Sequence, residues 1–362
     1  MRKISYAVIF ILALVLTACG NKTNTPAAET QAETKIETTA ETTAETVTET
    51  AAETVTNTTE ETAAETTAVT VTESAAPVRD ITFEDISRST FEFSSGAGAW
   101  MTNMNIERDG SFSGEYHDSD MGDQSESYKN GTVYLSRFTG QFTDLEKVDD
   151  YTYHFKIDKI RYRYEPGTEE YMDDFRFIYS TAYGLDKGEN FYIHCPGKAM
   201  SELSEDVYNW IFMAAQNKQT LEFYVIENRE QGQAFYSYPR QSVAEEAKQI
   251  LDGAEATYNS IEKDLTTKDM PQIDLEFTAK RMDDETDYSL NRLWNLIKNN
   301  TDEATYNKLL EEQRSWLTTR DKTVEEKTKD SKGGSIYGML VYMERAKLTI
   351  ERCRELAKVL TH

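Results

Sequence analysis

The spacing of the hydrophobic residues changes near residue 240 of this 362-residue chain, and this change limits the fold more than any other feature. From about 80 to 240, short runs alternate apolar and polar residues, as in Tyr151-Thr-Tyr-His-Phe-Lys-Ile157. Such alternation is typical of strands that bury one face. From 241 to 362, apolar residues recur every three or four positions, as in amphipathic helices. We therefore predict an α+β chain in which a β-rich region precedes a helical region.

The β-rich region is predicted to be a mostly antiparallel barrel or sandwich with one helix. The pair Asp109-Gly110 stands between two alternating runs and predicts a hairpin. The helix is expected at about 204–216, with Ser204 as its N-cap and Val207, Trp210, Ile211 and Ala214 on one face. Further strands are expected at 132–138, 141–142, 151–157, 160–164, 175–179, 191–194 and 221–226.

The helical region is predicted to be an antiparallel four-helix bundle, because four amphipathic stretches have short connections. The first two are expected at about 243–265 and 271–298. Asn300 with Glu303 has the pattern of a capping box that would open the third. Lys332-Gly333-Gly334 ends it, and Ser335 can cap the fourth, whose apolar stripe includes Cys353.

The N-terminus has the pattern of an export signal. Arg2 and Lys3 precede an apolar run, Ile4 to Leu16, that is shorter than the roughly 20 residues needed to span a bilayer. The ending Leu16-Thr-Ala-Cys19, followed by Gly20, resembles the lipobox of bacterial lipoproteins. This resemblance implies that 1–18 are removed and that a lipid on Cys19 anchors the protein to the outer face of the bacterial cell membrane.

Residues 19–79 repeat Thr, Glu and Ala with almost no large apolar side chain. Such a segment cannot bury enough apolar surface to fold, so we expect a disordered tether with a reach of roughly 40 Å. The remaining residues suffice for two domains, which we place at 80–240 and 241–362.

Composition and motifs argue against several functions. The net charge of −25 and the pI near 4.6 disfavour nucleic acid as a partner. Cys195 and Cys353 fall in different predicted domains, so two separate buried thiols are expected rather than a disulfide. We find no metal-ligand spacing, no Ser-His-Asp arrangement and no phosphate loop, so the sequence predicts no catalytic residue, metal or cofactor.

The helical region carries a family resemblance in four motifs. They are Asp287-x-x-Leu290-Asn291-x-x-Trp294, Gln313-Arg314-Ser315-Trp316-Leu317-x-x-Arg320-Asp321, Gly333-Gly334-Ser335 and Thr349-x-x-Arg352-x-x-x-Leu356. In order and spacing they resemble the N-terminal domain of LprI-type lysozyme inhibitors, over roughly the last third of the chain. The resemblance implies exported helical domains that interact with lysozyme. Such domains usually carry paired cysteines, one of them after the Arg-Asp pair, where this chain has Lys322-Thr323-Val324.

Two interpretations of these motifs remain open. Gln313, Trp316 and Arg320 lie on one helical face, either as a core anchor whose polar groups pair with carboxylates such as Asp287, which we favour, or as a recognition face. The candidate interaction or structural residues are Asp287, Asn291, Trp294, Gln313, Arg314, Trp316, Arg320 and Asp321.

The function predicted from these features is that of a lipid-anchored extracytoplasmic binding protein, without catalysis, that binds or inhibits lysozyme-like muramidases at the cell envelope. An acidic surface suits a basic lysozyme. The alternative is a small-ligand or glycan receptor acting through the β domain, because Gly98-Ala99-Trp100 before a strand resembles the opening of lipocalin-type barrels. A cell-wall hydrolase is a remote alternative.

Overall fold

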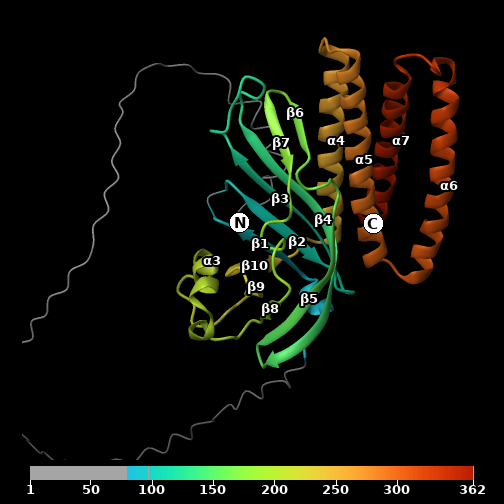
Figure 1. Cartoon of the computed structure of the whole chain (residues 1–362). Helices are drawn as coiled ribbons and strands as arrows, with labels where there is room; N and C mark the ends of the chain where they lie inside the picture. The colour runs from blue at the N-terminus through green and yellow to red at the C-terminus, as the bar shows by residue number, and fades with distance from the viewer. Residues whose placement is uncertain (1–79, 97, 362) are drawn as a thin grey trace, which may run out of the picture. The chain divides into compact units, whose positions relative to one another are not determined.

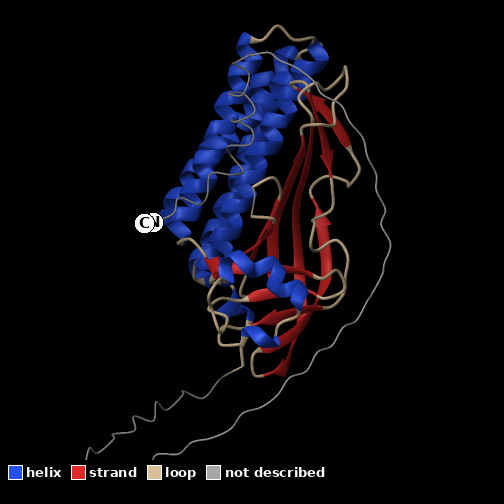
Figure 2. Ribbon diagram, turned by 90° about the vertical axis from the view of Figure 1, so that its left-hand side faces the viewer, coloured by secondary structure: helices blue, strands red, loops and turns tan. Residues whose placement is uncertain are grey.

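The computed structural model describes residues 80–96 and 98–361 (Figures 1 and 2). The predicted signal peptide, Cys19 and the tether lie outside these residues and stay predictions. Residues 79–362 form one compact unit with its own hydrophobic cores, and can therefore be studied as a fragment.

The strands form a closed antiparallel barrel with an added hairpin. Eight of them make a ring in the order β1, β2, β3, β4, β5, β8, β9 and β10, and β10 pairs with β1. β7 pairs in parallel with the beginning of β4, and β6 extends the sheet beyond it. The strands are β1 (Ser89–Ser94), β2 (Met101–Ile106), β3 (Ser111–Asp120), β4 (Thr132–Asp149), β5 (Thr152–Tyr162), β6 (Glu169–Met172), β7 (Phe175–Tyr179), β8 (Phe191–His194), β9 (Val225–Asn228) and β10 (Gln233–Pro239).

Turns and strand lengths agree only partly with the sequence prediction. The Asp109-Gly110 hairpin is confirmed, and Gly110 adopts φ +78°, which favours glycine. The runs 132–138 and 141–142 are wrong as separate strands, because β4 continues through Gly140. A Cβ atom there would lie 2.1 Å from the Phe112 ring, so this glycine makes room for a side chain of β3.

Other strands also differ from the prediction. The runs 151–157 and 160–164 are one strand, β5, whose pairing with β4 contains irregularities that break the simple alternation. The predicted strand 221–226 begins only at Val225, and β6 and β10 were not predicted. The predicted run begins at Leu221, directly after Thr220, which forms an isolated bridge with Ala199. Before Val225 the chain therefore lies beside a loop and outside β9.

Aromatic side chains fill the interior of the described barrel. Phe91, Phe93, Phe191 and Phe235 are completely buried. The connection between β7 and β8 adds further apolar side chains to this core, which includes Leu185. A small ligand would need space that these side chains occupy, so the hypothesis of a ligand inside the barrel loses its support.

Five helices complete the main elements in the described ranges, after the one-turn helix α2 (Phe83–Ile86). α3 (Glu205–Ala215) packs outside β9 and β10, and the Ser204 hydroxyl accepts from the Val207 N–H as predicted. Ala214, expected on its buried face, is exposed, and Ala215 is buried instead. The long helices are α4 (Val243–Thr267), α5 (Gln272–Asn300), α6 (Glu303–Thr328) and α7 (Tyr337–Thr361).

The four long helices confirm the predicted α+β order. The predicted cap of the third is wrong: α5 continues to Asn300, and the Asp302 carboxylate accepts from the Thr305 N–H at 3.0 Å. The two cysteines within the described residues, Cys195 and Cys353, are free and buried, as predicted. Burial raises the pKa of Cys353 to about 12.

The arrangement of the bundle adds a feature that the sequence did not predict. α4, α5 and α7 pack on one another, whereas α6 packs mainly on α7 and lies on the side away from the barrel (Figure 1). Arg345 pairs with Asp283, in the first half of α5. Farther along both helices, the Cys353 sulfur lies 3.8 Å from the Thr286 carbonyl oxygen. α5 and α7 therefore run parallel, and α6 is the return connection between them.

Candidate interaction site on the helical bundle

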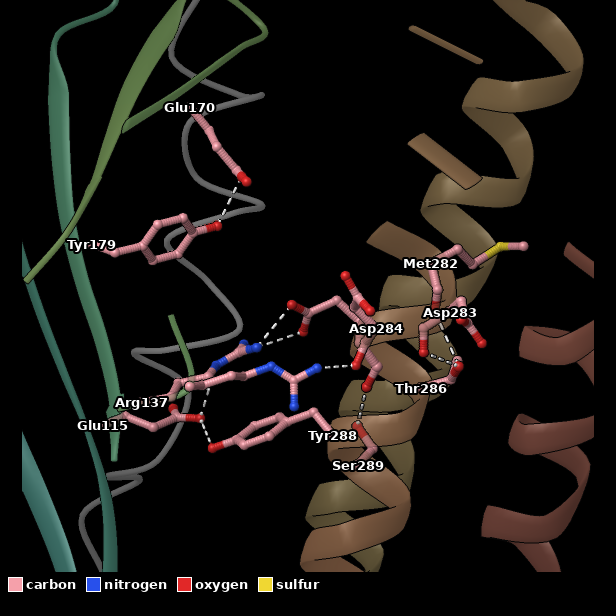
Figure 3. A network of polar contacts seen from close by, with 12 residues as sticks. Glu115, Arg137, Glu170, Tyr179, Met282, Asp283, Asp284, Thr286, Tyr288 and Ser289 are labelled. Carbon is pink, nitrogen blue, oxygen red and sulfur yellow. Dashed lines mark hydrogen bonds and ion pairs between the residues drawn. The ribbon is translucent and has the colours of Figure 1, made fainter. Parts of the chain in front are cut away.

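The barrel covers one face of α5 through a network of charged and aromatic side chains (Figure 3). Arg137 of β4 donates from Nη1 to both carboxylate oxygens of Glu285, at 2.8 Å each. Its Nε lies 3.4 Å from Oε1 of Glu115, which also accepts from the Tyr288 hydroxyl at 2.7 Å. These residues come from β3, β4 and α5, so they join the sheet to the bundle.

Arginines also stack on Tyr288. The guanidinium carbons of Arg137 and Arg163 lie 4.3 and 4.8 Å from the centre of its ring, and Arg163 donates to the Asp284 carbonyl oxygen. Burial raises the pKa of Glu115, but Arg137 and Arg292 outweigh burial, and the resulting pKa lies below its usual value. Because this face of α5 is occupied, a macromolecular partner must approach the bundle from another side.

Two of the three candidate residues on one face of α6, Gln313 and Trp316, contact Arg352 of α7, whereas Arg320 contacts Trp316 on its own helix. The Gln313 Oε1 atom accepts from Arg352 Nε at 2.9 Å, and Gln313 is buried. The Trp316 ring packs on the bundle core between two guanidinium groups, 5.2 Å from that of Arg320 and 5.8 Å from that of Arg352. These contacts hold α6 on α7, and they support a structural role for this face.

Of the other candidate residues, Asp321 contacts that face through Arg320, and no contact with it is found for Asp287, Asn291, Trp294 and Arg314 within the described residues. Asp287 accepts from Asn291 Nδ2 at 3.0 Å on its own helix, so the expected pairing across helices does not occur. Trp294 packs on the core, 5.7 Å from the Tyr306 ring. Arg314 is exposed and pairs with the neighbouring Glu311, and Arg320 donates from Nε to the adjacent Asp321 at 3.1 Å.

A buried ion pair joins α5 and α7, and the sequence did not predict it. Arg345 Nε donates to both carboxylate oxygens of Asp283 at 2.8 Å, and Asp283 is buried. Burial raises the pKa of Asp283, and the opposing effect of Arg345 only partly offsets this rise. A carboxylate beside Met282 on the apolar side of the helix was the available signal, because such a group needs a partner.

A hollow of about 240 Å³ opens between the C-terminal half of α6 and the N-terminal half of α7. Asp321 and Glu325 contribute exposed carboxylates, and Arg345 reaches it from α7. The hollow is lined by Asp321, Val324, Glu325, Thr328, Tyr337, Val341 and Arg345. It lies on the helices that the barrel leaves uncovered, and we call it the α6–α7 hollow.

Residues 80–96 and 98–361 contain neither a cluster of metal ligands nor a helix that could span a membrane. No group of three or more His, Cys, Asp or Glu side chains in these ranges is arranged to hold a metal ion. None of the helices in the same ranges is long and apolar enough to cross a membrane.

A known protein family matches the part of the chain that contains these bundle contacts. The family model "Lysozyme inhibitor LprI" matches residues 263–356. The match, called the LprI-like region below, covers all of α5 and α6 and most of α7, and it contains all eight candidate residues of the bundle. The resemblance inferred from the motifs is therefore confirmed for the C-terminal region. No curated protein and no solved structure matches the chain.

Proposed function

We propose that this protein is a lipid-anchored extracytoplasmic binding protein whose LprI-like region binds and inhibits lysozyme-like muramidases. The observation that carries the proposal is the family match over α5, α6 and α7. Within that match, Gln313 and Trp316 hold α6 on α7, which keeps the α6–α7 hollow on the side of the bundle away from the barrel.

Charge supports the α6–α7 hollow as the part that meets the enzyme. The side chain of Asp321 is 66% exposed, and Glu325 is exposed one turn farther along α6. Carboxylates at the rim of an interface steer a basic protein and pair with its lysine and arginine side chains. Arg320 pairs with Asp321 and Asp283 holds Arg345, so Glu325 is the carboxylate that leaves the hollow with a net negative charge.

Inhibition of hen egg-white lysozyme by residues 79–362 tests the proposal. We expect a concentration-dependent loss of cell-wall lysis in a turbidity assay and a matching heat of binding by calorimetry. The double variant Asp321→Asn/Glu325→Gln should weaken binding about tenfold. The matched control Glu311→Gln/Glu312→Gln removes the same charge from the same helix outside the hollow and should change binding little. If the protein neither binds nor inhibits lysozyme at tens of micromolar, the proposal is refuted.

The lipid anchor is tested separately in cells. Wild-type protein should incorporate a labelled fatty acid and sediment with membranes. Cys19→Ser should abolish both, because the sulfur is the proposed attachment site. Labelling that survives this substitution would exclude Cys19 as the anchor.

A further inference from the structure

The outward face of α3 is apolar, although this helix lies on the surface of the barrel. Tyr208, Phe212 and Met213 are 38%, 41% and 77% exposed. The opposite face buries Val207 and Ile211 against β9 and β10. An amphipathic surface helix usually presents polar side chains outward, so α3 is unusual in having apolar residues on both sides.

These three side chains, which we call the α3 patch, stand on a rigid base. The Tyr208 and Phe212 rings, one helical turn apart, meet edge to face with centroids 5.9 Å apart. Trp210 Nε1 donates to the Gly232 carbonyl oxygen at 2.7 Å and ties the helix to the loop before β10. Because the inner face is already occupied by completely buried residues, the exposed rings cannot turn inward.

Carboxylates gather at the N-terminal end of the same helix. Glu205 and Asp206 are exposed and form no ion pair within the described residues. Glu202, 60% exposed, lies 3.6 Å from Lys198 Nζ, but that lysine is almost completely buried and also faces Asp149. At the other end, Lys218 is paired with Glu222 at 2.6 Å. The surroundings of the patch are therefore negatively charged.

We propose that the α3 patch is a docking surface for a basic protein, one that presents an apolar side chain flanked by lysine or arginine. Tyr, Phe and Met are enriched at protein interfaces, where a polar rim surrounds an apolar centre. The carboxylates complement a basic partner, whereas the anionic surface of a membrane would be repelled by them. α3 packs on the barrel and outside the LprI-like region, so this surface is additional to the one proposed for muramidases (Figure 1).

The test uses immobilised peptides and residues 79–362. We expect a leucine–lysine peptide to bind wild type about tenfold more tightly than Phe212→Ser/Met213→Ser. A serine–lysine peptide of equal charge should bind both proteins weakly. The matched control is Ile273→Ser/Phe277→Ser on α5, because these residues have the same exposures of 77% and 41%. Circular dichroism confirms that each variant is folded.

Charge is tested by Glu205→Gln/Asp206→Asn, which should weaken binding of the leucine–lysine peptide and reduce its dependence on salt. Three results would overturn the proposal: equal binding by wild type and the α3 variant, an equal loss in the α5 control, or no preference for the leucine-containing peptide. Binding to anionic phospholipid vesicles that depends on Phe212 and exceeds binding to the peptide would assign the α3 patch to membranes instead. Retained lysozyme inhibition in the α3 variant would show that the two surfaces act independently.

Discussion

Replacement of Arg137 by methionine should destabilise the junction between barrel and bundle. The substitution keeps a long side chain but leaves Glu115 and Glu285 without their shared cation. Removing one partner of a buried ion pair costs about 3–5 kcal/mol. The three side chains here are between 20% and 27% exposed, so water recovers part of this cost, and we expect a loss of about 2–3 kcal/mol in the free energy of unfolding.

Urea denaturation followed by circular dichroism and tryptophan fluorescence measures this loss. A cycle with Glu285→Gln isolates the pair, and we expect a coupling energy of about 1.5–3 kcal/mol, as for hydrogen bonds between charged groups. Arg161→Met, an exposed arginine on β5, is the control and should change stability by less than about 0.5 kcal/mol. Additive effects of the two junction variants would refute the assignment of Arg137 and Glu285 as an energetic unit.

Three further predictions concern the bundle, the barrel and pH. Trp316→Ala should cost about 3 kcal/mol in unfolding free energy, because the ring fills the space between α6 and α7; a folded, equally stable variant that no longer inhibits lysozyme would instead make Trp316 a recognition residue. Gly140→Ala should cost more than about 2 kcal/mol by thermal denaturation, because the added methyl would overlap Phe112, whereas Gly122→Ala in an exposed turn should cost little. The pKa of Glu115 is lower in the folded protein than its ordinary value of 4.5, so its contribution to stability is present above that pH and is lost as the pH falls toward the folded pKa. Urea midpoints at pH 7, 4.5 and 3.5 should fall in that order, and Glu115→Gln should reduce the decline.

The sequence predicted those parts of the fold that depend on local pattern. Alternation and the Asp109-Gly110 turn indicated antiparallel strands, and the helical period with the Ser204 cap placed α3. The predicted runs 132–138 and 141–142 leave out Gly140, and only the tertiary position of the Phe112 ring over this glycine explains why β4 continues through it. Local pattern does not contain that information.

The sequence predicted which residues belong to the candidate site better than it predicted which of their side chains pair with one another. The motif residues lie within the region matched by the family model, but Asp287 bonds to its own helix and Gln313 pairs with Arg352 instead. Which polar groups meet depends on how each helix is rotated and on which helices are neighbours. Because α5 and α7 are parallel neighbours, the Asp283–Arg345 pair forms between helices that a simple sequential bundle would not place side by side.

The position of α6 as the return connection bears on how such a protein can change over evolutionary time. α4, α5 and α7 form the core mainly among themselves, and much of α6 is exposed. Substitutions on its outer side, or insertions in the loop at Gly333-Gly334, meet few packing constraints. One helix and its two loops can therefore change in sequence and length, while the remaining helices and the barrel keep the fold.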